Sequence, residues 1–232
     1  EAVLHPGDVL SVPVRCFRGF EVVGDVYGFV FVILGGQNAG GGIEWHPDVL
    51  LEGRKHGLYL LWDKTLVDTA AGQAVPDESE LFEPMSQRQA ESYSDYSVDE
   101  MMQFVSLAGS RQPGEPFSTD GGFIQYNISG HPDADDDFDI RSRDGVCIYG
   151  YGTSGGRIVP MHRRREKQVL QQFSGDVELV FDDSSVPPVV LTPGDTFDLP
   201  QGTGFSLRGL RGESVTYCFV HGDNPGQPEL VP

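Results

Sequence analysis

Three polar side chains lie close together in the sequence and have types that could do chemistry together: His162, Arg164 and Gln168. In an extended strand, residues two positions apart point to the same side, so His162 and Arg164 would share a face. A histidine can act as a general acid or base, and the planar guanidinium of arginine suits a carboxylate or a phenolate. The set therefore indicates a metal-free pocket for a small anionic ligand.

Glycine and proline residues frame these side chains in two regular patterns. The first is Gly156-x5-His162-x-Arg164-x3-Gln168-x6-Gly175, and the second is Gly194-x5-Pro200-x-Gly202-x2-Phe205. Together they resemble the double motif of the cupin superfamily, G-x5-H-x-H-x3-E-x6-G followed by G-x5-P-x-G-x2-H. The resemblance implies a mostly β fold, a cupin β-sandwich or jelly-roll barrel with a complete C-terminal copy and a few linking helices.

The resemblance also implies four metal-ligand positions, of which this chain keeps one. His162 is retained, whereas Arg164, Gln168 and Phe205 stand where the second His, the Glu and the third His would be. A cationic side chain repels a metal ion, and phenylalanine cannot coordinate one. We therefore expect no metal in the C-terminal cupin. The alternative to a ligand pocket is a scaffold that has lost its site, with Arg163–Arg165 paired to nearby acids.

Two tyrosines on the preceding segment join the candidate pocket. Val146–Tyr151 is predicted to be a strand, and the period of two places Tyr149 and Tyr151 on one face. They could line the barrel or be ordinary core aromatics. The candidate pocket residues are Arg18, Tyr149, Tyr151, His162, Arg164, Gln168 and Phe205.

An internal repeat links the two ends of the chain. The segment Leu4–Pro13 matches Leu191–Pro200 at an offset of 187, so the early copy has only the second half-motif. There Arg15 replaces the second Gly, and Arg18 stands where the third His would be. The apolar run Tyr27–Leu34 is predicted to be a buried strand because of its length and β-branched residues.

Half a sandwich leaves sheet edges uncovered. Three explanations stay open: a missing N-terminal fragment completes the early copy, a second subunit does so by exchange in a possible homodimer, or the early strands extend the late sandwich. A completed early copy could hold Fe, Mn, Ni or Cu through ligands outside this chain.

The predicted domains are residues 1–36 for the early half-copy, 37–120 for an inter-domain segment and 121–232 for the C-terminal cupin. A helix is expected from His46-Pro47, with Gly57 ending it. Ser97 and Glu100 form a capping box. Leu58–Trp62 is a strand or a helix, Phe123–Ile128 is a strand, and the acidic run Asp133–Asp139 is expected to be solvated rather than to hold calcium.

Composition narrows the possible partners and location. The 232 residues carry a formal net charge of −19, which argues against nucleic acid or an anionic membrane as partners. No apolar run is long enough to cross a membrane. Cys16, Cys147 and Cys218 are too few for a disulfide framework and are expected to be core residues in a reducing, cytoplasmic setting.

The connecting segment Gly41–Pro47 and the helix after it are similar to the inter-domain region of two-cupin proteins resembling quercetin dioxygenase. This resemblance implies a bicupin dioxygenase acting on a small aromatic or enolic substrate, with any metal in the early copy. The alternative is a metal-free cupin that binds or isomerises a small anionic ligand, or a purely structural cupin. Fold alone does not choose between them.

Overall fold

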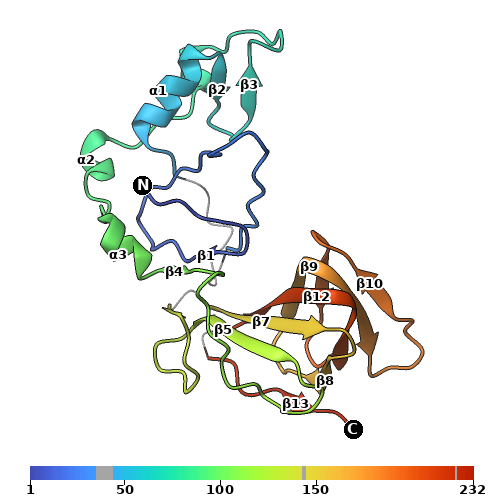
Figure 1. Cartoon of the computed structure of the whole chain (residues 1–232). Coiled ribbons are helices and arrows are strands. Elements are labelled where there is room, and N and C mark those ends of the chain that lie inside the picture. Colours follow the sequence, from blue (N-terminus) through green and yellow to red (C-terminus); the bar gives the residue numbers. More distant parts are fainter. Residues whose placement is uncertain (35–43, 143–144, 223) are drawn as a thin grey trace. The chain divides into compact units, whose positions relative to one another are not determined.

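A computed structural model describes residues 1–34, 44–142, 145–222 and 224–232 (Figure 1). The described chain forms two compact units. The larger contains Glu1–Ser11, the described part of 28–39 and Ser97–Pro232, and the smaller contains Val12–Tyr27 and the described part of 40–96. The predicted boundary between residues 36 and 37 lies outside the described residues, and the three-part division stays a prediction.

Strands dominate the described residues, as the sequence predicted. The helical elements are α1 (Pro47–Lys55), α2 (Gln87–Ala90), α3 (Val98–Met102) and the 3-10 turn η1 (Glu78–Glu80). The strands are β1 (Val9–Leu10), β2 (Leu58–Leu60), β3 (Leu66–Asp68), β4 (Val105–Ser106), β5 (Ile124–Gly130), β6 (Ile140–Arg141), β7 (Val146–Ser154), β8 (Ile158–Arg163), β9 (Gln168–Phe181), β10 (Val189–Leu191), β11 (Thr196–Leu199), β12 (Phe205–His221) and β13 (Glu229–Leu230).

In the described part of the larger unit, one nine-stranded hydrogen-bonded sheet folds over into two facing layers, and the long strands β9 and β12 run through both layers (Figure 1). The first half of β12 pairs with the second half of β9 and with β8, while β10 pairs with β9 on its other edge. The second half of β12 pairs with the first half of β9 and with β7, which pairs with β5. The result is the predicted jelly-roll sandwich.

The ladder between β9 and β12 bends at Gly175. Its φ of +66° lies in the left-handed region, and a Cβ there would come within 2.4 Å of the carbonyl oxygen of Glu213. Register shifts on β12 flank the same point, around Arg211 and Val215. Only glycine meets both demands without strain, so the last glycine of the first motif allows both strands to pass from one layer to the other.

The main core lies between the two layers. Along β7, the buried side chains of Cys147, Tyr149 and Tyr151 alternate with residues of the other face, as the period of two requires. The strand predicted at Val146–Tyr151 is therefore confirmed and extends to Ser154. The core also contains Phe123, Phe138, Val159, Leu170, Val177, Leu179, Leu191, Leu199, Phe205, Leu207, Cys218 and Val220.

A second apolar cluster covers the outer face of the sheet formed by β5, β7 and β12. It centres on Ile128, Tyr217 and Phe219, and Val9 of the early repeat packs against it. The ring of Phe31 lies 5.5 Å from that of Phe219. The early segment therefore covers a face that would otherwise expose aromatic surface to water.

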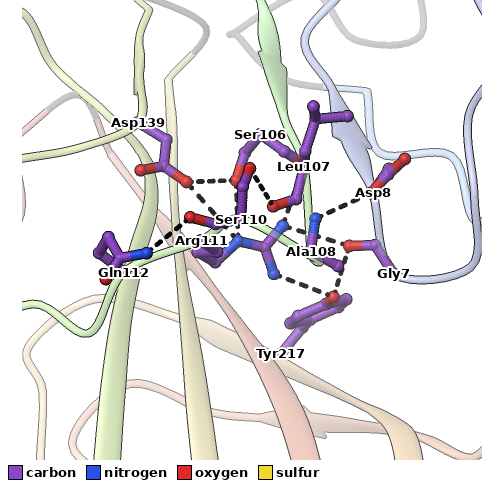
Figure 2. A network of polar contacts seen from close by, with 10 residues as sticks. All are labelled: Gly7, Asp8, Ser106, Leu107, Ala108, Ser110, Arg111, Gln112, Asp139 and Tyr217. Atoms are coloured by element: carbon purple, nitrogen blue, oxygen red, sulfur yellow. Dashed lines mark hydrogen bonds and ion pairs between the residues drawn. The ribbon is translucent and has the colours of Figure 1, made fainter.

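Arg111 connects the turn at Gly7 to this face through a network of polar contacts (Figure 2). Its guanidinium donates to the Ser106 hydroxyl at 2.8 Å, the Gly7 carbonyl at 3.2 Å and the Tyr217 hydroxyl at 3.3 Å, and it lies 3.6 Å from Asp139. The Tyr217 hydroxyl donates to the same Gly7 carbonyl at 2.7 Å. The side chain of Arg111 is only 4% exposed, so these bonds replace the water it loses.

The early and late copies of the repeat share one turn geometry. Gly7 and Gly194 have φ of +92° and +98°. In each turn an aspartate carboxylate accepts from the backbone N–H three residues earlier, at 2.8 Å for Asp8 and 2.7 Å for Asp195. Arg15 has a φ of +57°, near the +75° of its late counterpart Gly202. The repeat inferred from the sequence is thus also a repeat of backbone conformation.

The prediction for the run Tyr27–Leu34 is wrong. It forms no strand, and every side chain in it is exposed, with Tyr27 at 91% and Phe29 at 73%. The equivalent late segment on β12 is paired on one side with β7 and on the other with β9. The early run has no such neighbours among the described residues, so its apolar sequence alone cannot bury it. Gly35 and Gly36, predicted to end it, lie outside those residues.

Several local predictions are confirmed. Helix α1 has His46 as N-cap and Pro47 in its first turn, and Gly57 follows its C-cap. Ser97 and Glu100 form the expected capping box at α3. Leu58–Leu60 is a strand, as is Ile124–Gly130.

Solvent exposure tests the predictions for the acidic run and for the cysteines, and the length of the helices tests the membrane expectation. The acidic run Asp133–Asp139 is largely exposed, and Cys147 and Cys218 are buried as expected. Cys16 is only half-buried. No helix in the described ranges has the length and apolar character needed to cross a membrane.

The left-handed conformation of Arg15 makes a stability prediction. Its backbone is held there, since its carbonyl accepts from the N–H of Ser94 at 2.9 Å. A non-glycine residue in this region costs roughly 1 kcal/mol. We expect Arg15→Gly to be more stable than Arg15→Ala by roughly that amount in urea unfolding. Both variants lose the arginine side chain, so equal stability would contradict the strained left-handed backbone at this position.

The buried network makes a second prediction. Arg111→Met keeps much of the volume but removes the donors to Gly7, Ser106 and Tyr217, and we expect it to lower the free energy of unfolding by about 3 kcal/mol. The matched control is Arg88→Met at an exposed position, which should change stability by less than about 0.5 kcal/mol. Equal effects of the two substitutions would show that the network contributes little.

Candidate functional site

Six of the seven predicted pocket residues gather inside the sandwich. Tyr149 and Tyr151 come from β7, His162 from β8, and Arg164 from the turn directly after β8. Gln168 begins β9 and Phe205 begins β12. None of the six is more than 4% exposed. The seventh, Arg18, is exposed and belongs to the smaller unit, so its role stays a prediction.

His162 is a neutral imidazole with a defined tautomer. Its Nδ1 lies 2.8 Å from the carbonyl oxygen of Pro160, which can only accept, so Nδ1 carries the hydrogen. Its Nε2 is buried and has no partner. Burial lowers the pKa of His162 to about 4, and the charge of Arg164 acts in the same direction against the opposing effect of Pro160. At neutral pH the free nitrogen is therefore a hydrogen-bond acceptor.

Aromatic rings enclose the imidazole. The ring of Phe205 lies 4.3 Å from that of His162, and the ring of Phe117 lies 4.6 Å away. Tyr151 packs edge-on at 6.1 Å. These rings exclude water from the imidazole, and this is the physical origin of its lowered pKa.

Arg164 is a buried cation that lacks a carboxylate partner in the described ranges. Its guanidinium lies 4.9 Å from the centre of the Tyr149 ring, and Nη1 donates to the Gly226 carbonyl at 2.5 Å. Its Nε–H has no partner. Burial alone would lower the pKa of Arg164, but the neighbouring groups of Tyr151, Cys218 and Tyr149 raise it, so the side chain stays charged.

Gln168 and Tyr151 add two more donors. The thiol of Cys218 donates to Gln168 Oε1 at 3.5 Å, which leaves the amide nitrogen of Gln168 without a partner. Burial raises the pKa of Cys218 to about 12, so the thiol keeps its proton. The Tyr151 hydroxyl lies near Arg164 without hydrogen-bond geometry, and burial raises its pKa well above the usual value. Both Tyr151 and Gln168 therefore offer hydrogens.

The site thus presents three donors and one acceptor without partners. They are the Tyr151 hydroxyl, the Gln168 amide, Arg164 Nε–H and His162 Nε2. Buried polar groups nearly always find a partner, so four unpartnered atoms on residues of one interior make this the candidate site. Two other unpartnered atoms, on Ser142 and Arg163, belong to half-buried residues.

The metal that the cupin resemblance implies does not fit these side chains. The described residues contain no group of three or more His, Cys, Asp or Glu able to hold a metal ion. Within the sandwich, the Phe205 ring packs on His162 and the guanidinium of Arg164 brings positive charge beside it. This arrangement suits an anion, because it offers donors and a cation, and the Asp136 carboxylate accepts from the Tyr149 hydroxyl at 3.4 Å with no ion pair to the guanidinium among the described residues.

Two residues that position the site were not among the sequence candidates. Pro160 fixes the tautomer of His162, and Cys218 orients the amide of Gln168. Sequence analysis placed Cys218 in the core correctly. Its contact with Gln168 follows from the antiparallel pairing of β9 with β12, which no short motif encodes.

Comparison with known proteins gives likeness of fold only. No family model matches this chain, and no curated protein matches it. Similar solved structures include the DMSP lyase DddQ from Ruegeria pomeroyi DSS-3, with 20% identity and a TM-score of 0.45 over 53% of this chain. The polyketide cyclase RemF from Streptomyces resistomycificus has 15% identity and a TM-score of 0.43, covering 55% of this chain and 84% of its own.

An RmlC-like cupin from Shewanella frigidimarina NCIMB 400 has 14% identity and a TM-score of 0.38, covering 50% of this chain and 88% of its own. Three of the similar structures carry the word cupin in their names, and this one is among them. This chain spans 62% of the length of DddQ, less than two thirds.

The lowered pKa of His162 predicts a pH dependence of stability. Between pH 6.5 and 4 the unfolded chain binds a proton that the folded site refuses, so stability should fall as pH falls through this window. The contribution is roughly 3 kcal/mol at most. His162→Gln cannot titrate, so wild type should lose stability relative to this variant on acidification in urea unfolding. Parallel pH profiles for the two proteins would contradict the lowered pKa.

Proposed function

We propose that the C-terminal sandwich is a metal-free binding site for a small organic anion. The observation that carries this proposal is the buried guanidinium of Arg164, which has a carbonyl and an aromatic face as neighbours and no carboxylate among the described residues. A buried charge without a counter-charge is costly, so such sites normally have an opposite charge supplied. A ligand carboxylate or phenolate would provide it.

The other side chains suit the same role. Tyr149 covers one face of the guanidinium and leaves its edge for hydrogen bonds. The Tyr151 hydroxyl and the Gln168 amide would donate to further oxygens of the anion. The surrounding rings exclude water, which strengthens each of these bonds.

A purely structural sandwich is the competing interpretation. A sandwich that has lost its ligand can fill its interior with apolar side chains, and Phe205 does this at one former ligand position. Arg164, Gln168 and Tyr151 differ, because they keep unpartnered polar atoms in the interior. A scaffold has no need of those atoms, and apolar residues of similar size would be at least as stable.

The dioxygenase expectation concerns the early copy and stays a prediction. It needs Fe, Mn, Ni or Cu held by residues outside this chain, supplied by an N-terminal fragment or a second subunit. Arg18 would be the contribution of this chain to that copy. The cytoplasmic location likewise stays a prediction.

Removal of the guanidinium tests the proposal. We expect acetate, propionate or benzoate to bind the wild-type chain in isothermal titration calorimetry, and Arg164→Met to weaken binding by about tenfold or more. The control is Arg163→Met, since the neighbouring Arg163 is partly exposed and pairs with Asp182 at 3.2 Å. This control should change binding by less than about twofold.

The folded state of each variant is checked by thermal unfolding. If Arg164→Met does not fold, Arg164→Lys replaces it. Lysine keeps the positive charge but lacks the planar, bidentate guanidinium, so this variant should still bind the anions more weakly. Absence of binding of all three anions to the wild type, or unchanged binding in a folded Arg164 variant, would leave the scaffold interpretation.

A further inference from the structure

The unpartnered acceptor at His162 does not match a simple carboxylate. A carboxylate offers only lone pairs, so it satisfies Arg164, Gln168 and Tyr151 and leaves Nε2 of His162 without a hydrogen. A buried acceptor left unpaired is costly. This nitrogen is not exposed to bulk solvent, and the rings of Phe117 and Phe205 pack against the imidazole. The site therefore requires one hydrogen-bond donor from its ligand.

This requirement depends on the orientation of the imidazole ring, which the Pro160 carbonyl sets. A flipped ring would turn Cδ2–H toward that carbonyl and lose the hydrogen bond, whereas the observed ring donates from Nδ1 at 2.8 Å and leaves Nε2 as an acceptor. Protonation of His162 would turn Nε2 from an acceptor into a donor, but burial lowers the pKa of His162 and keeps the ring neutral near pH 7. With the ring in this orientation, the site has three donors and one acceptor without partners.

The geometry points to a small hydroxycarboxylate as the ligand. We propose that its carboxylate binds at Arg164 and that its hydroxyl donates to Nε2 of His162 while accepting from Tyr151 or Gln168. A hydroxyl is the simplest group that can do both, because it has one hydrogen and two lone pairs. This inference rests on the proposed anion site and narrows the class of ligand that the site selects.

Matched pairs of ligands test the inference. Acetate is compared with glycolate, and propionate with 3-hydroxypropionate, so that each pair differs by one hydroxyl and the two pairs place it at different distances. We expect the hydroxylated member of at least one pair to have a dissociation constant lower by about tenfold or more, because its hydroxyl supplies the hydrogen that Nε2 lacks. Binding is measured by titration calorimetry at pH 7.

A variant at His162 isolates the acceptor. In His162→Leu the ratio of the dissociation constants within the preferred pair should fall to within about twofold, whatever the change in the affinity for the unhydroxylated member, because only the hydroxyl uses Nε2. If this variant does not fold, the ¹⁵N resonance of His162 Nε2 in the wild type replaces it. That resonance should shift on adding the preferred hydroxycarboxylate and not on adding its unhydroxylated match.

The outcomes separate the two proposals. No binding of any member of either pair removes the anion site itself. Equal affinities within both pairs keep the anion site and overturn the hydroxyl preference. The assignment of the hydroxyl to His162 is also overturned if folded His162→Leu still prefers the hydroxylated ligand. The same holds if the Nε2 resonance shifts equally with the hydroxylated and unhydroxylated ligands.

Discussion

The pairing of β9 with β12 is the constraint on which the rest of the larger unit depends. β7, β8, β10 and β11 each pair directly with one of these two strands, and β5, β6 and β13 join the sandwich through β7, β5 and β8. The ladder between β9 and β12 can bend because Gly175 accepts a left-handed conformation close to the backbone of Glu213. The bend brings the starts of β9 and β12, and with them Gln168 and Phe205, to the same interior as His162.

The part of the fold that was predictable from sequence is the part that local backbone chemistry controls. The motif glycines Gly156, Gly175, Gly194 and Gly202 all have positive φ, which only glycine adopts at low cost. Their spacing therefore predicted the turns, and through them the sandwich. The run Tyr27–Leu34 failed because burial of a strand depends on neighbours elsewhere, and an apolar sequence cannot report whether those neighbours are present.

The candidate site divides in a similar way. The i, i+2 alternation predicted that His162 and Arg164 would face inward, and both are buried. The sequence did not predict which groups of the site donate and which accept hydrogen bonds. The tautomer of His162 depends on the Pro160 carbonyl, and the orientation of the Gln168 amide depends on Cys218. The interior therefore holds one cation, neutral donors and a single acceptor, a set whose charge is opposite in sign to that of a metal-binding carboxylate cluster.

The twin turns have a consequence for protein design. Gly7 and Gly194 share a conformation, their aspartates close the same loop, and Arg15 occupies the left-handed position that Gly202 fills in the other copy. The short sequence Pro-Gly-Asp therefore forms the same turn at two places in the chain, with different side chains around it. A designer could exchange the two turns, because each supplies its own glycine conformation and its own carboxylate acceptor.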